Sequence, residues 1–145
     1  MKIVSFNIRG LGNSPKRDSL KRLLEIVNPS ILLLQKTMDS SSVACDFFLR
    51  IKHSWKCCAI DVAGLSAGLL LAWDPSYADL RSFVTVVRMM VEGNIKGFKS
   101  SIRIRNVYGP YSHRQDFWEN VERVVLLQDN SLILAGDFNL TLSTN

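Results

Sequence analysis

The residues with the clearest chemical potential are Asp137 and Asn139, in the sequence Gly136-Asp137-Phe138-Asn139. Residues 131–135 before them are rich in leucine and isoleucine, which predicts a buried strand. Side chains two residues apart at the end of a strand point to the same side, and Gly136 allows the backbone to run close to its neighbours. A carboxylate beside a neutral amide can hold a metal-bound phosphate and position a water molecule. The same residues after a strand can also simply form a turn.

Several other predicted strands end in polar or glycine-rich segments. The apolar patterns predict strands at residues 2–8, 31–34, 55–62, 69–73, 80–91 and 98–107, besides the strand that begins at residue 131. Their ends carry Asn7, the pair Gln35-Lys36, the loop 64–68, and Asn106 with Tyr108. Ligand sites form where strand ends meet, so we expect these groups to lie close to Asp137.

Helices are expected between the first strands. Ser14 is the predicted N-cap of the first helix, with Pro15 at the first helical position. This helix should end near Asn28, because Pro29 disfavours the helical conformation in the residue before it. Residues 40–51 carry apolar side chains at helical spacing and predict a second helix.

The second half of the chain adds a hairpin and a third helix. Residues 92–94, Glu-Gly-Asn, are the expected turn of the hairpin, and Ser112 with Gln115 has the form of a capping box before the third helix. The expected order is strand, helix, strand, helix, four strands, helix, strand. This order predicts a mixed, layered α/β domain.

Composition adds weaker constraints. The 145 residues suit one domain, and no apolar run approaches the ~18 residues that span a membrane. Lysine and arginine number 18 against 13 aspartate and glutamate, which weakly favours a polyanionic partner such as nucleic acid, although scattered charges usually form a solvated surface. Cys45, Cys57 and Cys58 lack metal-ligand spacing and are odd in number, so we expect reduced thiols, no disulfide-linked partner and an intracellular protein. Cys57 and Cys58 should point to opposite faces of their strand.

Five motifs in order resemble those of the endonuclease/exonuclease/phosphatase superfamily. They are Ser5-Phe6-Asn7-Ile8-Arg9-Gly10-Leu11, Leu33-Leu34-Gln35-Lys36-Thr37, Gly64-Leu65-Ser66-Ala67-Gly68, Asn106-Val107-Tyr108-Gly109-Pro110 and Gly136-Asp137-Phe138-Asn139. The residues of these motifs are most similar to those of the apurinic-endonuclease-like domain of plant LINE-type non-LTR retrotransposons. The resemblance covers essentially the whole chain, residues 1–145, as a partial domain of that superfamily.

The resemblance implies a fold, an activity and a partner. The fold is a four-layer sandwich of two mixed β-sheets flanked by helices. The activity is Mg²⁺-dependent hydrolysis of phosphodiester or phosphomonoester bonds, with DNA as the partner and the nucleus as the place of action on DNA. By this resemblance Asp137 aligns or deprotonates the attacking water, Asn139 stabilises the developing charge, and Tyr108 touches the scissile phosphate. Asn7 helps to orient the metal, and the phosphate or DNA contacts are Asn106 and Arg9.

Lys36 departs from the superfamily motif. The resemblance places a glutamate that ligates the metal at this position. A protonated lysine has three donors and no acceptor, so it cannot ligate Mg²⁺. At about 4 Å and an effective dielectric near 20, each unit of repelled charge costs roughly 4 kcal/mol, and a divalent ion meets about twice that. We therefore expect weak metal binding.

The late Ser-Asp-His motif of the superfamily has no counterpart before Asn145. Neither His53 nor His113 can be assigned to its role. The resemblance thus implies a domain truncated before its C-terminal strands, and a catalytically impaired copy of a DNA phosphodiesterase. Two alternatives stay open: a non-catalytic nucleic-acid-binding remnant in which Lys36 pairs with phosphate, and a phosphomonoesterase of the same superfamily.

Overall fold

The computed structural model describes residues 1–61, 68–84, 89–126 and 131–140. The helices within these ranges are α1 (Ser14–Val27), α2 (Ser41–Ile51) and α3 (Arg114–Leu126). The strands are β1 (Ile3–Asn7), β2 (Ile31–Gln35), β3 (Lys56–Ile60), β4 (Leu69–Trp73), β5 (Ala78–Val84), β6 (Met89–Ile95), β7 (Ile102–Tyr108) and β8 (Ser131–Asp137). No helix in these ranges is long and apolar enough to cross a membrane.

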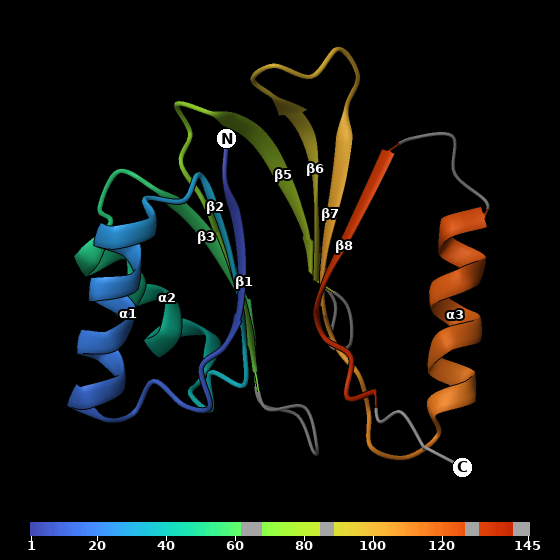
Figure 1. Cartoon of the computed structure of the whole chain (residues 1–145), viewed down its shortest axis with the longest axis horizontal. Helices are drawn as coiled ribbons and strands as arrows, with labels where there is room; N and C mark the ends of the chain where they lie inside the picture. Colours follow the sequence, from blue (N-terminus) through green and yellow to red (C-terminus); the bar gives the residue numbers. More distant parts are fainter. Residues whose placement is uncertain (62–67, 85–88, 127–130, 141–145) are drawn as a thin grey trace.

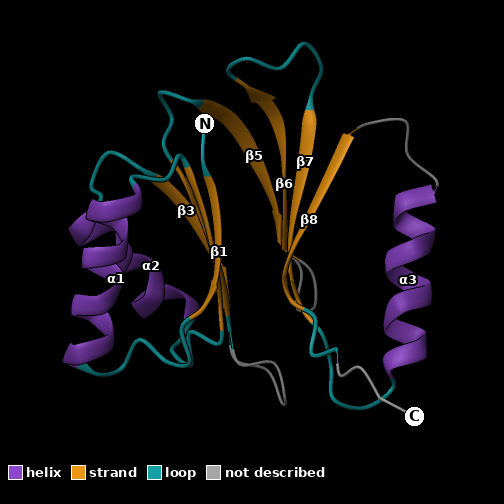
Figure 2. Ribbon diagram, viewed as in Figure 1, coloured by secondary structure: helices purple, strands orange, loops and turns teal. Residues whose placement is uncertain are grey.

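The strands form two mixed four-stranded sheets, ordered β1-β2-β4-β3 and β5-β6-β7-β8. In each sheet one pair is parallel, β1 with β2 and β7 with β8, and the other pairs are antiparallel. Figure 1 shows α1 and α2 outside the first sheet and α3 outside the second, and Figure 2 shows the same layering by element type. The predicted α/β sandwich of two mixed sheets flanked by helices is therefore confirmed.

The core has two parts, one on each face of the first sheet. Leu33 and Leu71 face the second sheet and pack with residues such as Ile104, whereas Leu32 belongs to the cluster beneath α1 and α2. Every residue of β2 is buried, as its run of consecutive apolar residues predicted. Each fully buried leucine contributes about 1.5–3 kcal/mol of transfer free energy, so this strand anchors both layers.

The two neighbouring cysteines of β3 fall on opposite sides, as the sequence predicted. Cys57 packs against the cluster beneath the helices, and Cys58 packs against the cluster between the sheets. Burial raises the pKa of the Cys58 thiol to about 12, and a hydrogen bond with Cys45 raises that of Cys57. These two thiols are therefore held in their neutral, poorly nucleophilic form.

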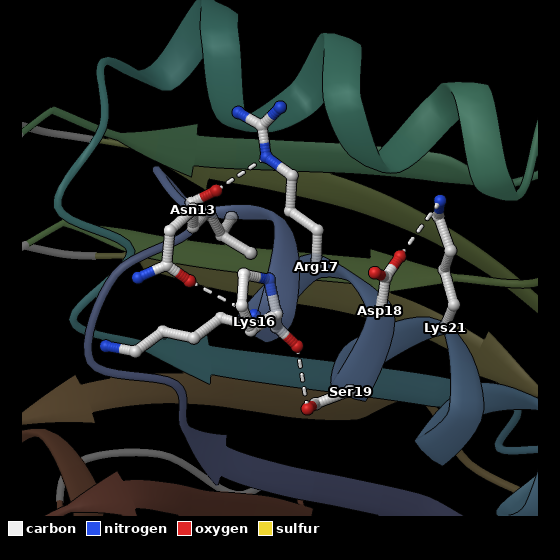
Figure 3. Close-up of polar contacts among 8 residues, drawn as sticks. Asn13, Lys16, Arg17, Asp18, Ser19 and Lys21 are labelled. Carbon is white, nitrogen blue, oxygen red and sulfur yellow. Dashed lines mark hydrogen bonds and ion pairs between the residues drawn. The ribbon is translucent and has the colours of Figure 1, made fainter.

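The N-cap of the first helix lies one residue earlier than predicted. Asn13, and not Ser14, is the N-cap: its side-chain Oδ1 accepts a hydrogen bond from the Lys16 backbone N–H at 3.1 Å (Figure 3). Pro15 still lies in the first turn, where its missing N–H costs nothing. The predicted end is confirmed, because Asn28 is the C-cap in a left-handed conformation with φ 47°.

The prediction of one long strand at residues 80–91 is wrong. The region contains parts of two strands, β5 and β6, which pair antiparallel, and residues 85–88 lie outside the described ranges. The described chain thus has five strands between α2 and α3, where four were predicted. Residues 92–94 lie inside β6 and form no turn. A β-carbon at Gly93 would collide with the Asp79 carbonyl oxygen, so this glycine serves close strand pairing.

The predicted capping box at the start of α3 is also wrong. His113 immediately precedes the helix, and its carbonyl accepts a hydrogen bond from the Phe117 N–H at 3.3 Å. The Gln115 side chain instead donates to Glu119, one turn further along. The predicted glycine loop at residues 64–68 lies outside the described residues except for Gly68.

Candidate functional site

The site lies where the carboxyl ends of four strands meet at one edge of the two packed sheets. Parallel pairing brings the ends of β1 and β2 together, and likewise those of β7 and β8. The Asn7 side-chain amide at the end of β1 donates to Asp137 Oδ2 at the end of β8, at 2.5 Å. This bond joins the two sheets. The predicted meeting of these strand ends is therefore observed.

Asp137 is held by hydrogen bonds from three directions. Besides the bond from Asn7, its Oδ1 accepts from the Asn139 backbone N–H at 3.0 Å, and its backbone carbonyl accepts from Gly109 at 2.7 Å. The Asn139 side-chain amide donates to the Gly109 carbonyl oxygen. The carboxylate is therefore fixed in place, while its remaining lone pairs can still accept a proton or a hydrogen bond.

Two glycines allow the close approach of β8 to β7 that this geometry requires. A β-carbon at Gly136, whose φ is 152°, would collide with the Val107 carbonyl oxygen, and one at Gly109 would collide with that of Phe138. Both positions therefore exclude a side chain for steric reasons. The expectation that Gly136 brings the backbone close to its neighbour is confirmed.

Lys36 lies at the end of β2 and faces two tyrosines. Its Nζ donates to the Tyr111 hydroxyl at 2.9 Å and stands 5.0 Å from the ring centroid of Tyr108 and 5.4 Å from that of Tyr111. Hydrogen bonding to the two phenols raises the pKa of Lys36 and, reciprocally, lowers the pKa of Tyr111. Lys36 is therefore a firmly protonated cation at the site.

Asn106 lies beneath the site and not on its surface. It is 2% exposed, and its amide donates to the carbonyl oxygens of Leu34 at 3.0 Å and Leu70 at 2.9 Å. Its Oδ1 accepts from Gln35 Nε2 at 2.8 Å. The structure thus corrects the predicted phosphate contact, because Asn106 is a buried cross-link between β7 and the first sheet.

Arg9 lies in the loop after β1, is exposed, and has no hydrogen-bond partner for its guanidinium among the described residues. Its carbonyl oxygen accepts a hydrogen bond from Lys16 Nζ. The position leaves the guanidinium free to meet a ligand at the rim, as the predicted contact with phosphate requires. That contact stays a prediction.

Unusual backbone conformations gather in the segments that follow these strands. Among the described residues, six that are not glycine have a left-handed φ, and five of them come after β1, β2, β7 or β8. These five are Arg9, Lys36, Met38, His113 and Asn139. Each such conformation costs on the order of 1 kcal/mol, and such strain concentrates at functional sites.

The donor set at this edge does not fit a divalent metal. Asn7 Oδ1 is buried without a hydrogen-bond partner, and Asp137 supplies one carboxylate. The Lys36 ammonium opposes cation binding by these two oxygen sources, because it repels a cation and offers no lone pair. The described residues contain no group of three or more histidine, cysteine, aspartate or glutamate residues that could hold an ion.

Tyr111 was missed by the sequence reasoning. It is 57% exposed, contacts Lys36 directly and meets the Tyr108 ring edge-on at 6.3 Å between centroids. The available signal was a second tyrosine three residues after Tyr108 in a segment that follows a strand. Nothing in that spacing predicts that its hydroxyl reaches across to the other sheet.

No protein-family model matches this sequence, and no curated protein matches it. Solved structures share its fold. A D. rerio TDP2 humanized by 14 mutations aligns with a TM-score of 0.69 at 18% identity, over 96% of this chain and 66% of that chain. An endonuclease/exonuclease/phosphatase family protein from Leptotrichia buccalis gives 0.66 at 17% identity, over 96% and 66%. The 3′ phosphatase NExo from Neisseria, bound to a product DNA hairpin, gives 0.63 at 19% identity, over 97% and 58%.

These likenesses establish the fold that the motifs predicted. At 17 to 19% identity they show the fold alone. The chain spans 58 to 66% of the length of these three structures.

Proposed function

We propose that this chain is a partial member of the endonuclease/exonuclease/phosphatase superfamily, and that its site handles phosphate esters of nucleic acid. The observation that carries the proposal is the hydrogen bond between Asn7 and Asp137, which brings the first and last motifs together across two sheets. The fold similarity to NExo, a 3′ phosphatase solved with product DNA, supports a nucleic-acid substrate. The order of the motifs and their residues support an origin among LINE-type retrotransposon endonucleases that act on DNA in the nucleus.

In the proposed hydrolysis each side chain has a role. Asp137, fixed through hydrogen bonds from Asn7 and Asn139, presents its free lone pairs as a base that aligns and deprotonates water. Tyr108 pairs with Asp137 in the β7–β8 register, and Asn139 follows two residues later; in the proposed reaction both donate to phosphate oxygens. Arg9 at the rim adds a positive charge for the nucleic-acid backbone.

The proposal includes impaired catalysis. The superfamily reaction depends on Mg²⁺, and Lys36 stands where the motif has its metal-binding glutamate. The raised pKa of Lys36 keeps that repulsive charge in place at neutral pH. Hydrolysis by this chain should therefore be slow or undetectable. The Lys36 charge favours the second candidate function, binding of nucleic acid without cleavage.

The test is cleavage of supercoiled plasmid and of a 3′-phosphorylated oligonucleotide in Mg²⁺. The proteins are the unaltered chain, Lys36→Glu, and Lys36→Glu combined with Asp137→Asn. Each is assayed alone and fused to the unmatched portion of an active superfamily member. We expect cleavage only from the fused Lys36→Glu protein, and its loss when Asp137 is also changed. Release of phosphate without nicking would identify a phosphomonoesterase.

Equal cutting by the fused proteins with Lys36 and with Glu at position 36 would overturn the proposed impairment. If no fused protein cuts although all unfold cooperatively, the proposed hydrolytic site is wrong.

A further inference from the structure

Lys36 carries a charge that the described protein does not neutralise. The ion pairs of the described residues join Lys21 to Asp18 and Arg103 to Glu92, and neither involves Lys36. Its hydrogen-bond partners are instead the phenols of Tyr111 and Tyr108. A protonated amine near a site edge without a carboxylate partner retains its attraction for an anion.

The surroundings leave a donor free for a ligand. An ammonium group has three N–H donors, and its hydrogen bonding to the Tyr108 and Tyr111 phenols uses two of them. The faces of Tyr108 and Tyr111 stand 5.0 and 5.4 Å from the nitrogen and stabilise its charge without consuming a donor. One N–H group of the ammonium, with its full positive charge, is thus available to an oxygen of a phosphate group.

The backbone and the neighbouring aromatic ring suit the same ligand. Lys36 follows β2 with a left-handed φ of 56°, a strained conformation of the kind that gathers at functional sites. The Tyr111 ring, 57% exposed, lies beside the ammonium and offers a surface on which an unpaired base can stack. A cation for the phosphate next to an exposed ring for the base is the recognition pattern of single-stranded nucleic acid.

We propose that Lys36 and Tyr111 bind a phosphate group of single-stranded nucleic acid directly, without a divalent metal. The proposal rests on the proposed function, because it places the ligand at the same strand ends. It deepens that function by assigning to one protein side chain the positive charge that a metal would otherwise supply. Binding should therefore persist when every divalent ion is removed.

The test is fluorescence anisotropy of a labelled single-stranded oligonucleotide at low salt in EDTA. The site variants are Lys36→Met, Lys36→Arg, Tyr111→Phe and Arg9→Met. The matched control is Lys96→Met, because Lys96 also stands over a tyrosine, Tyr77, at 6.0 Å, but follows the end of β6, which pairs with the start of β7 and not with the end that carries the site. Lys36→Met, Arg9→Met and Lys96→Met each remove one positive charge. Lysine and methionine meet the same steric cost at the left-handed φ of position 36, since neither is glycine.

We expect the unaltered chain to bind equally in EDTA and in Mg²⁺. Lys36→Met should weaken binding at least about tenfold and flatten the salt dependence by roughly 0.7 in log–log slope, the value for one phosphate contact on a single strand. Lys36→Arg should restore most of the affinity, Tyr111→Phe should weaken it severalfold, and Lys96→Met should change it less than twofold. Unchanged thermal unfolding of each variant shows that loss of binding is not loss of fold.

The outcomes separate two failures. Unchanged binding by Lys36→Met, with weakened binding by Arg9→Met, would overturn the role of Lys36 and leave a nucleic-acid site at this edge. No binding by the unaltered chain, or binding that none of the site variants weakens, would overturn both this proposal and the proposed function. Binding that appears only with Mg²⁺ would overturn the metal-free mode alone.

Discussion

The Asn7 amide and the Asp137 carboxylate, 130 positions apart in the chain, are joined by a hydrogen bond of 2.5 Å between Nδ2 and Oδ2. The bond links the parallel pair of the first sheet to that of the second. A bond to a charged, partly buried acceptor contributes roughly 1.5–3 kcal/mol. Asn7 therefore has a structural role that is independent of any metal.

A double-mutant cycle measures that role. Asn7→Ala, Asp137→Ala and the double variant should give a coupling free energy of unfolding of about 2 kcal/mol in denaturant titrations. The coupling arises because each single change removes the same bond. Additive effects of the two changes would show that the contact contributes nothing to stability.

Asn106→Ala should destabilise the chain by roughly 3 kcal/mol. The change removes the buried hydrogen bonds that Asn106 donates to the Leu34 and Leu70 carbonyls and the one that it accepts from Gln35 Nε2. Urea unfolding of this variant is compared with Asn94→Ala, an exposed asparagine in β6, which should change stability by less than about 0.5 kcal/mol. Equal effects at both positions would contradict the cross-link.

Gly136→Ala should destabilise the fold by at least about 1 kcal/mol, because a β-carbon there collides with the Val107 carbonyl and φ is 152°. Gly12→Ala is the matched control, since a β-carbon at Gly12 has no neighbour within 4 Å. Thermal unfolding should separate the two variants by several degrees. A neutral Gly136→Ala variant would argue against the close pairing of β7 with β8.

The Lys36–Tyr111 contact predicts a pH dependence with a defined sign. Hydrogen bonds to the Tyr108 and Tyr111 phenols raise the pKa of Lys36, and the bond from Lys36 lowers the pKa of Tyr111. An NMR pH titration should therefore give Tyr111 a pKa below its ordinary value of 10.0. In Lys36→Met the pKa of Tyr111 should rise again. The contribution of this contact to stability is present below pH 10.5, the ordinary pKa of lysine, and is lost as the pH rises through the raised pKa of Lys36. An unchanged titration in the variant would place the two groups apart in solution.

Much of the fold could be predicted because its signals are local. The consecutive apolar residues of β2 predicted a strand covered on both faces, and Pro29 predicted the end of α1. The break between β5 and β6 was missed because the apolar alternation continues into both strands. The cap at Asn13 was missed because two neighbouring residues are both good caps.

The site was predictable in its location but not in its details. The polar strand ends indicated the edge where Asn7 and Asp137 meet. Sequence could not tell that Asn106 points between the sheets while Tyr111 reaches across them, because both facts depend on tertiary packing. The chemical character of Lys36 was visible in the sequence, yet its partners were not.

Titration calorimetry of Mg²⁺ shows whether Lys36 replaces metal charge at this edge. Cooperative thermal unfolding first shows that the unaltered chain and Lys36→Glu are folded. Both are then titrated under identical conditions, with Lys96→Glu as the charge-matched control. We expect no heat of binding from the unaltered chain or Lys96→Glu, and saturable binding by Lys36→Glu that disappears when Asp137→Asn is added. Saturable binding of Mg²⁺ by the unaltered chain, lost on Asp137→Asn, would show that Lys36 does not take the place of the metal.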